Sequence, residues 1–478
     1  MSGTAAPTAA VQVPTQKEAA VGARQRLEAL CDPGSFRPLR SRVLSRRLGE
    51  RAHGGDGVLA GAGRVSGRPV FCYAQDPAFM GGSLGEAHAD SIVRVMELAG
   101  EASAPVVGFI ESGGARLQEG HAGLAGYGRI FRKSVELSSR VPQISVVTGV
   151  SAGGGSYSPA LTDFVLMTSS ARMFLTGPRV VREALGEEVT MEELGGPRVH
   201  EGNGVCQLVA DSEEEATDRV RELLGLLPQV IGERSPLAAP GPAGGSDPSA
   251  PVPAEARRVY DVREVIAAIV DQGRLLEISS RWARNMVTGF ARLDGRPVGI
   301  VANQPRRLGG VIDAVASEKA AHFVDMCDRF GIPLVVLVDT PGFMPGTRQE
   351  GAGVIRHGAS LLRAFAGASV PRVTVVLRKA YGGAVITMNS KDLGANVVFA
   401  WPGAEIGIMA ANQAVGVVHR RRLRDADDPE ALGANLAAAY AEEHLTAAAA
   451  AASGFIDEVI EPTDTRRSLA WALGSLER

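Results

Sequence analysis

The chain has 478 residues, which is too long for one hydrophobic core, so two domains of roughly 200 residues each are expected. Its 50 Lys and Arg residues nearly balance 53 Asp and Glu residues, and the net charge of −3 argues against general binding to nucleic acid or membrane surfaces. No apolar run approaches the ~20 residues that a membrane-spanning helix needs.

The first half alternates short apolar strands with helices, which indicates an α/β fold. Residues 1–21 lack the apolar core of a signal peptide and are expected to form a disordered tail. We place the N-terminal domain at 22–235. Its predicted strands lie at 58–65, 69–75, 106–110 and 144–147, with a glycine turn directly after the last, and its predicted helices at 90–99 and 213–226.

A stretch rich in Pro, Gly, Ala and Ser at 232–258 separates the two halves, and we assign 236–257 to an exposed linker. The C-terminal domain, 258–478, repeats the pattern with a helix around Cys327 and with strands at 334–338 and 373–377. Near its end, Asp428 and Pro429 form a good helix start. One helix is predicted to run from there through the alanines at 447–452 to a glycine cap at Gly454.

The two halves share their sequence features in the same order and at a nearly constant spacing, which indicates a gene duplication. Gly-Arg-Pro-Val at 67–70 recurs at 295–298. Gln-Glu-Gly at 118–120 recurs at 349–351. Each half then reaches a glycine pair, at 153–154 in the first and at 382–383 in the second. A duplicated fold with two matched glycine turns suggests one site built between two halves.

The glycine turns are the main candidates for chemistry. Each follows a strand and precedes a predicted helix, so backbone N–H groups at the helix start point outward as donors. Such donors suit an oxyanion hole, which binds the oxygen of an enolate or of a tetrahedral intermediate. A purely structural turn is the competing interpretation, and the matched turn in the second half weakens it.

Two short motifs resemble other active sites but lack the context that those sites need. Residues 149–153 fit the G-x-S-x-G elbow of serine hydrolases, with Ser151 as nucleophile. The duplicated position is Ala380, which argues against that role. The glycines at 61–67 resemble a dinucleotide-binding loop, but strands flank them on both sides and the third glycine is one place late.

Loops at 112–120 and 340–347 each follow a buried strand, and α/β folds place ligands at this end of the strands. Both loops are predicted to form pocket walls. Arg116 and Glu119 in the first loop could equally form a surface ion pair. The eight histidines show no metal-ligand spacing, and the four cysteines form no CxxC pair, so no metal is expected and a reduced cytoplasmic setting is favoured.

Eight ordered motifs carry a family resemblance that covers about residues 22–470 apart from the linker. The motifs are MGGSLGE (80–86), SGGARLQEG (112–120), YSPALTDF (157–164), LTGP (175–178), GEEVTMEELGG (186–196), ANQP (302–305), VDTPGF (338–343) and RKAYGGA (378–384). Together they resemble the carboxyltransferase (β) subunit of biotin-dependent acyl-CoA carboxylases, most of all the propionyl-CoA and acetyl-CoA carboxylase β subunits of actinobacteria.

The resemblance implies two duplicated crotonase-like (ClpP-like) α/β domains in a homohexamer, with active sites between the N-terminal domain of one subunit and the C-terminal domain of another. Acyl-CoA would bind the first half and carboxybiotin the second. The catalytic positions transferred by the resemblance are Gly153 and Gly154 for the thioester enolate oxygen, and Gly383 and Ala384 for the ureido oxygen of biotin. Substrate contacts fall on Gly113, Gly114, Ala115, Arg116, Tyr157 and Ile386, and biotin contacts on Pro341, Gly342, Phe343, Tyr381 and Gly382.

The implied chemistry transfers a carboxyl group from carboxybiotin to the α-carbon of an acyl-CoA such as acetyl-CoA or propionyl-CoA. Both intermediates are enolates, so two backbone donor turns are needed and no side-chain base is. From the sequence, no His or carboxylate that could act as a base is expected near either turn, which agrees with this chemistry. The sequence has no Met-Lys-Met biotin-attachment motif and no ATP-grasp segment, so a partner (α) subunit must supply the biotin carboxylase and the biotin carrier.

Three departures from the family pattern leave the identity of the acyl chain undetermined. Gly155-Ser156 replaces a bulkier pair and is expected to enlarge or loosen the acyl pocket, Ala410 replaces a glycine near the biotin side, and Ile386 is apolar where the family lines its acyl pocket. Competing functions are a biotin-dependent decarboxylase subunit, a crotonase-type CoA hydrolase or isomerase, and a non-catalytic scaffold.

Overall fold

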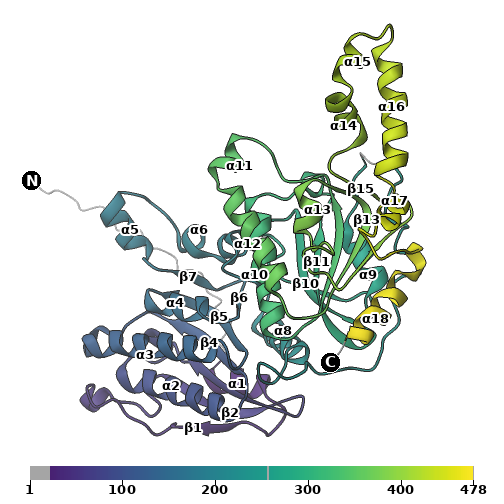
Figure 1. The fold of residues 1–478 in the computed structure, drawn as a ribbon. Helices are drawn as coiled ribbons and strands as arrows, with labels where there is room; N and C mark the ends of the chain where they lie inside the picture. The colour runs from purple at the N-terminus through teal and green to yellow at the C-terminus, as the bar shows by residue number, and fades with distance from the viewer. Residues whose placement is uncertain (1–21, 256–257, 477–478) are drawn as a thin grey trace, which may run out of the picture.

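The computed structural model describes residues 22–255 and 258–476, and within them the chain forms two sheets with the same strand order (Figure 1). The predicted tail at 1–21 lies outside the described residues. The first sheet has the order β1-β2-β3-β4-β5-β6-β8, and β7 pairs with the end of β5. Its strands are β1 (Arg37–Leu39), β2 (Val58–Val65), β3 (Arg68–Gln75), β4 (Val106–Ser112), β5 (Gln143–Ala152), β6 (Phe164–Thr168), β7 (Arg172–Phe174) and β8 (Leu208–Ala210).

The second sheet repeats this order as β9-β10-β11-β12-β13-β14-β16, with β15 pairing the end of β13. Its strands are β9 (Leu275–Glu277), β10 (Met286–Leu293), β11 (Arg296–Asn303), β12 (Leu334–Thr340), β13 (Arg372–Tyr381), β14 (Val397–Ala400), β15 (Glu405–Gly407) and β16 (Glu458–Val459). The duplication extends to fine detail, because the ladder between β4 and β5 shifts register after Ile110, and the ladder between β12 and β13 shifts after Val338.

Helices cover both sheets, as apolar strands buried on two faces require. The helices of the first half are α1 (Ala23–Leu30), α2 (Glu86–Glu101), α3 (His121–Leu137), α4 (Gly154–Ala160), α5 (Pro178–Leu185), α6 (Met191–Gly195), α7 (Pro197–Asn203) and α8 (Glu213–Leu226). Those of the second half are α9 (Val262–Ile269), α10 (Ala314–Arg329), α11 (Thr347–Gly351), α12 (Val354–Gly367), α13 (Gly383–Thr387), α14 (Ala411–Val418), α15 (Arg420–Arg424), α16 (Pro429–His444), α17 (Ala447–Ala452) and α18 (Thr465–Leu476).

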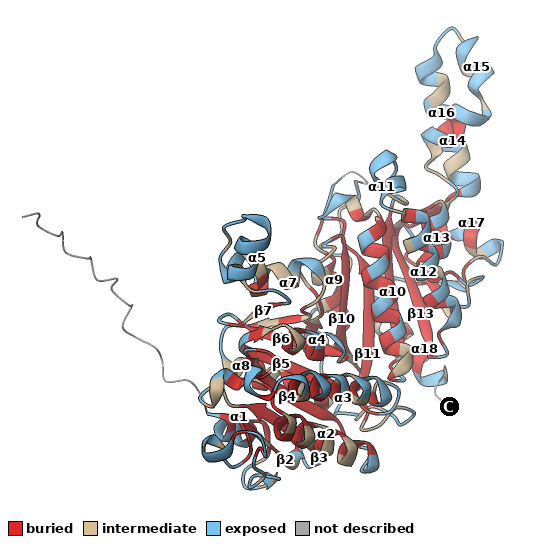
Figure 2. Cartoon of the chain, turned by 90° about the vertical axis from the view of Figure 1, so that its left-hand side faces the viewer, coloured by how far each residue is buried: buried red, intermediate tan, exposed pale blue. Residues whose placement is uncertain are grey.

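The two halves meet through aromatic rings and several ion pairs, one of which has a buried carboxylate. The ring of Phe164 in β6 stacks on Phe330 with centroids 6.3 Å apart and meets Phe290 edge-on at 6.0 Å. Beside them, Arg329 of α10 donates to Asp163 at 2.6 Å. Both contacts join residues from different halves, so one continuous core runs through the junction. The sheets and their inner helix faces form the buried part of the molecule (Figure 2).

The segment between α8 and α9 contains no helix or strand in its described residues and is tied to the second half. Ala238 donates its N–H to the carbonyl of Gly295 at 2.9 Å, and Gly244 donates to Ala267 at 3.1 Å. Arg378 of β13 donates to the carbonyl of Arg258 at 2.8 Å. These bonds fix where the connecting segment runs, while the domain boundary at residue 236 stays a prediction.

Two expectations about element ends are wrong. The strand predicted at 144–147 runs on to Ala152, so the turn begins at Gly153 and not directly after the apolar core of the strand. The helix predicted to continue from Pro429 through the alanines is two helices, α16 and α17. Leu445 is buried against Gly407 between them, and Thr446 caps the second one, because its hydroxyl accepts from the N–H of Ala449. The predicted caps at Asp428 and Gly454 are confirmed.

An arm made of α14, α15 and α16 projects from the second half (Figure 1). It occupies the connection from β15 towards β16, where the first half carries α5, α6 and α7 between β7 and β8. Within the described residues, no helix is long and apolar enough to cross a membrane.

Candidate active site

Two glycine turns of matching geometry end the central strands. Gly153 follows β5 with φ 58° and ψ −124°, and Gly382 follows β13 with φ 63° and ψ −149°. These backbone angles favour glycine over any residue with a Cβ atom. The next residues, Gly154 and Gly383, begin short helices. The duplicated sequence therefore builds the same strand–turn–helix corner twice.

The first amide of each turn already has a partner, and the second does not. Gly153 donates its N–H to the carbonyl of Phe174 at 3.1 Å, and Gly382 donates to Gly407 at 2.9 Å. Neither Gly154 nor Gly383 has a protein acceptor for its N–H among the described residues, as expected at a helix start. The first glycine of each pair thus supplies the turn conformation, and the second presents a donor.

A loop amide lies beside the donor of the first half. Leu84 donates to the carbonyl of Gly114 at 2.8 Å, and Arg116 donates to the carbonyl of Leu84 at 2.9 Å. Because alternate residues of such a bridge point to opposite sides, the N–H of Ala115 points away from Leu84, on the side of β5. A Cβ on Gly114 would lie 3.2 Å from the carbonyl oxygen of Ala152, so this loop runs close against the turn.

The second half repeats the arrangement. Ile312 donates to the carbonyl of Gly342 at 3.0 Å, and Met344 donates to Ile312 at 2.8 Å, which gives Phe343 the place that Ala115 has in the first half. Gly342 has φ 132°, and Pro341 is exposed beside it. Tyr381, the last residue of β13, is buried, and its hydroxyl donates to Glu405.

An aromatic ring supports each turn, but the two rings come from different elements. In the first half the ring is Tyr127 of α3, and a Cβ on Gly154 would lie 2.7 Å from its Cδ2. The hydroxyl of Tyr127 lies 3.2 Å from that of Ser112, and burial raises the pKa of Tyr127 to about 12, so it stays protonated. In the second half the ring is that of Phe343. A Cβ on Gly358 would lie 3.4 Å from the Cε1 and Cζ atoms of this ring.

The exchange of these rings follows the duplication. Tyr127 and Gly358 hold equivalent places, because each stands at the same distance after its copy of the repeated Gln-Glu-Gly. Ala115 and Phe343 are equivalent as well, since each forms the bridge beside its turn. The first half therefore has its ring on the helix and a small residue in the loop, and the second half has its ring in the loop and a small residue on the helix. Sequence comparison of the halves alone did not reveal this swap, because the two positions are adjacent only in space.

Arg116, predicted to contact substrate or to form a surface pair, is completely buried. It donates to Asp56 at 2.6 Å, to Glu119 at 2.9 Å and to the carbonyl of Ser83 at 2.8 Å. Burial raises the pKa of Asp56 against the pull of Arg116. Burial also opposes ionisation of Glu119, yet hydrogen bonds from Glu86, Ser45 and Arg116 lower its pKa. The surface-pair interpretation is wrong, and the guanidinium holds the loop behind Gly113 and Gly114.

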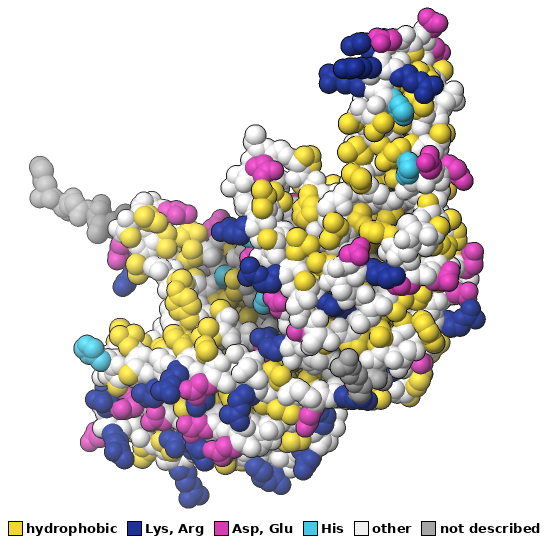
Figure 3. Space-filling view, in the orientation of Figure 1, with side chains coloured by type: hydrophobic (Ala, Val, Ile, Leu, Met, Phe, Trp, Pro, Cys, Tyr) yellow, Lys and Arg dark blue, Asp and Glu magenta, His cyan; other side chains and the backbone are white. Residues whose placement is uncertain are grey.

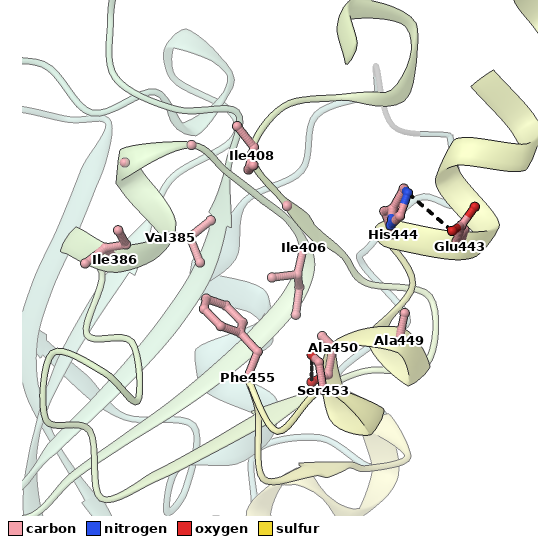
Figure 4. A pocket seen from close by; sticks show the side chains of 13 residues that line it. Val385, Ile386, Ile406, Ile408, Glu443, His444, Ala449, Ala450, Ser453 and Phe455 are labelled. Carbon is pink, nitrogen blue, oxygen red and sulfur yellow. Dashed lines mark hydrogen bonds and ion pairs between the residues drawn. The ribbon is translucent and has the colours of Figure 1, made fainter. Parts of the chain in front are cut away.

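A cavity of about 550 Å³ opens beside the second turn (Figure 4). Gly382, Gly383, Val385 and Ile386 form one wall, and β15, the end of α16 and α17 form the other. Ile386 is half exposed in it, whereas the methyl group of Ala384 is buried. The lining is mostly apolar and suits a ring system with one polar edge.

The same cavity contains a titratable pair that the sequence did not predict. His444 and Glu443, at the end of α16, lie 3.6 Å apart on its wall (Figure 4). The expectation that no His or carboxylate lies near either turn is therefore wrong for the second half. The pair forms the last two residues of α16, where no motif marks a functional residue, so no signal in the sequence could have found it.

The structure also places the remaining candidate residues from the sequence. Tyr157 is about half exposed in α4, close to the first turn, with its ring 6.2 Å from that of Phe131. Ser151 lies inside β5 and is fully buried, which does not fit an exposed hydrolase nucleophile. Gly61 and Gly63 lie within β2 against Phe36 and Cys31, not in a nucleotide loop. Among the described residues, no group of three or more His, Cys, Asp or Glu could hold a metal ion.

Two duplicated α/β domains, each with a glycine turn that presents an amide donor at the end of a central strand, fit the crotonase-like class of folds. Comparison with known proteins agrees. The family model of the carboxyl transferase domain matches residues 15–478. The 12S subunit of methylmalonyl-CoA carboxyltransferase from Propionibacterium freudenreichii subsp. shermanii is 47% identical over 460 residues, covering 94% of this chain and 87% of that one.

Two further matches support the same family. The propionyl-CoA carboxylase beta chain of Saccharopolyspora erythraea is 46% identical over 476 residues, covering 95% of this chain and 87% of that one. A crystal structure of transcarboxylase 12S, described as a hexamer with methylmalonyl-coenzyme A and methylmalonic acid bound, aligns with a TM-score of 0.92 at 46% identity, over 95% of this chain and 89% of that one. The chain belongs to the biotin-dependent acyl-CoA carboxyltransferase subunits, and the crotonase-like fold is confirmed.

Proposed function

We propose that this subunit transfers a carboxyl group from carboxybiotin to the α-carbon of a short acyl-CoA, with both reacting oxygens held by backbone amides. The observation that carries the proposal is the matched pair of turns, each of which leaves one helix-start N–H without an acceptor among the described residues. Donors fixed in this way stabilise charge that develops on an oxygen without having to reorganise.

Each half has a separate task in the transfer. On the acyl-CoA side, the N–H groups of Gly154 and Ala115 donate to the thioester oxygen and stabilise the enolate that forms when the α-proton leaves. On the other side, Gly383, with Ala384 behind it, donates to the ureido oxygen. Carboxybiotin, delivered on a partner's carrier domain, supplies the carboxyl group and the base that accepts the α-proton. The apolar walls around Ile386 and Phe343 exclude water from the reaction.

We propose that a complete site needs two subunits. The two turns belong to different halves of one chain. Each half also carries a helical segment after the short strand that pairs with the end of its turn strand, which is β7 in the first half and β15 in the second. The segment of the first half carries Glu183, Glu187, Glu188, Glu192 and Glu193, with Arg179 and Arg182 among them, and the arm of the second half carries the arginines of α15, Arg420, Arg421, Arg422 and Arg424, followed by Asp425, Asp427 and Asp428.

Both segments also expose apolar side chains, among them Leu185 at 75% and Val417 at 69% exposure. In Figure 3 the outer part of the arm carries dark-blue Lys and Arg side chains together with magenta Asp and Glu side chains, above a stem with many apolar side chains. Opposite charges and apolar surfaces on one chain fit a head-to-tail contact between copies, which a hexamer would close. In such a contact the acyl-CoA turn of one subunit faces the biotin turn of its neighbour.

We propose acetyl-CoA or propionyl-CoA as substrates, with Tyr157 and Ile386 at the acyl chain. Ser156 is buried, and its hydroxyl lies 2.8 Å from the carbonyl oxygen of Phe174, so this departure from the family pattern braces the turn and leaves the pocket wall to other residues. The carboxyl donor and its biotin carboxylase reside on a partner subunit in the cytoplasm.

A partner-free half-reaction tests the proposal. The purified protein is mixed with free biotin and, separately, with malonyl-CoA or methylmalonyl-CoA, and loss of the carboxyl group is followed. We expect decarboxylation that depends on biotin, because biotin accepts the carboxyl group in the reverse direction. Release of CoA without biotin would indicate the crotonase-type hydrolase instead. Net decarboxylation in the reconstituted complex that never reverses with ATP and bicarbonate would indicate a decarboxylase subunit.

A further inference from the structure

A second cavity, which shares no lining residue with the cavity beside the second turn, is lined almost entirely by polar and cationic side chains. It has a volume of about 410 Å³. We call it the arginine basin, and its lining residues are Asp261, Arg263, Ser280, Arg281, Arg284, Gln304, Arg306 and Arg307. They come from the start of α9, from the loop before β10 and from the loop after β11.

Cations outnumber anions in the basin. Its lining has five arginines and one aspartate, and even when the acids that reach in from outside, Glu201 and Glu277, are counted, the ratio is five to three. Arg263 pairs with Glu277 at 2.6 Å, and Arg281 with Glu201 at 2.9 Å. Arg306 lies 3.6 Å from Asp261, which Gln304 also holds, at 2.6 Å.

Arg284 and Arg307 are different, because no acid or other partner satisfies either guanidinium within the described part of the chain. Both are exposed at the basin. Two unpaired guanidinium groups in one concave, polar site leave planar donor forks directed at solvent. That geometry matches the oxygens of a phosphate group, which guanidinium binds in a bidentate way.

We propose that the arginine basin binds a phosphate-bearing ligand, with Arg284 and Arg307 as its principal anchors and Ser280 as a hydroxyl donor. The shared chemistry is a phosphoryl or pyrophosphoryl group. Its source is either the nucleotide end of the CoA substrate or a separate phosphorylated metabolite. This inference does not depend on the proposed carboxyl transfer.

The loop before β10, which supplies Ser280, Arg281 and Arg284 to the basin, is tied to the first half of the chain. Glu201 belongs to α7 of the first half and holds both Arg281 and the hydroxyl of Ser280. The same loop is also held by Lys319 of α10, which is buried and donates to the carbonyls of Ser279, Trp282 and Met286 at 2.8–2.9 Å. The walls of the basin are thus fixed before any ligand arrives, which reduces the entropy cost of binding.

The test is calorimetric titration of the full-length protein with pyrophosphate and with inorganic phosphate, at constant ionic strength set by chloride. We expect saturable binding that Arg284→Ala with Arg307→Ala weakens at least about tenfold, as loss of two charge-assisted contacts requires. A matched control, Arg132→Ala with Arg363→Ala, removes two exposed arginines of α3 and α12 that do not line the basin, and it should bind as the wild type does. Unchanged thermal unfolding of both variants confirms that they fold.

Two further arms identify the source of the phosphate. If CoA binds more tightly than dephospho-CoA and the difference disappears in the Arg284→Ala, Arg307→Ala variant, the basin holds the substrate's own phosphate. If pyrophosphate binds equally well with saturating CoA present, a separate ligand is its occupant. Equal binding of pyrophosphate to wild type and variant would overturn the proposal. A second outcome would also overturn it: the variant binds pyrophosphate as the wild type does, but its KM is raised for a biotinylated carrier and not for free biotin. That result would assign the arginines to carrier docking.

Discussion

At the scale of single residues, the two glycine turns look alike but tolerate change differently. A Cβ on Gly154 would lie 2.7 Å from the ring of Tyr127, which is packed and cannot withdraw. A Cβ on Gly383 would meet nothing nearer than Phe343, at 3.9 Å. The first turn therefore has no room for a methyl group, whereas the second has ordinary van der Waals space.

We expect Gly154→Ala to lower biotin-dependent decarboxylation by ~10²–10³, because the methyl group displaces the donor from its oxygen. Gly383→Ala should lower it less than about tenfold, since the added methyl meets only ordinary contact distances. Steady-state kinetics of both variants give the comparison. Gly128→Ala, on the exposed side of α3, is the control and should leave kcat unchanged. Equal losses in the first two variants would contradict the steric asymmetry.

Arg116 shows how a residue within a family motif can serve the fold. Removing its side chain by Arg116→Ala leaves Asp56 and Glu119 buried without their cation, which should destabilise the protein by about 3–5 kcal/mol. Chemical denaturation measures the loss. Adding Asp56→Asn and Glu119→Gln to the variant should recover part of it. A raised KM for acyl-CoA without any loss of stability would instead restore the substrate-binding role.

At the scale of elements, the sequence predicted several of the central strands and long helices, because each half repeats the same pattern, but it did not predict the short edge strands and most of the short helices. Errors arose where tertiary contact overrides local preference. β5 continues through Gly149 because β7 pairs with its end, and the alanine-rich helix breaks where Leu445 turns inward against Gly407. The glycine turns were found from sequence, but the ring that supports each turn was not, since it comes from different elements in the two halves.

The arm of α14–α16 is the element whose role is easiest to test. Reversing the charges of α15 with Arg420→Glu, Arg421→Glu and Arg422→Glu should repel the glutamates at 183–193 and shift the protein to smaller species. Light scattering coupled to size-exclusion chromatography measures this. Arg132→Glu with Arg363→Glu, on helices outside the arm, is the control and should assemble normally. An unchanged mass for the arm variant, with an unchanged salt dependence, would remove the arm from the interface.

At the scale of the whole molecule, the two halves are held together by an ion pair that titrates. Burial raises the pKa of Asp163 to about 6, against the pull of Arg329 and of the N–H of Gln143. Its ordinary value is 3.8. Between these values the folded state binds more protons than the unfolded state, so this carboxyl contributes stability at low pH and loses it as the pH rises through about 6.

Relative to Asp163→Asn, the wild type should therefore gain about 1 kcal/mol of stability between pH 7 and pH 5. Urea unfolding of both proteins at the two pH values measures the difference. Asp163→Asn loses the pairing with Arg329 at every pH, but its stability should lack this pH-dependent increment. Parallel pH profiles for the two proteins would show that Asp163 keeps its ordinary pKa in the folded state.

The exchanged rings give the two halves different freedom of movement. Tyr127 is fixed in a long helix, whereas Phe343 sits on a loop of irregular backbone between Thr340 and α11. Loops of this kind move within nanoseconds to microseconds, while a packed helix stays still on that timescale. On the proposed assignment, the ring that supports the acyl-CoA side stands on a helix, and the ring that supports the biotin side stands on a loop. A ligand carried on a tethered domain, which must arrive and depart in every turnover, would then enter the half whose supporting ring can adjust, and the CoA thioester would occupy the half whose ring is held by a helix.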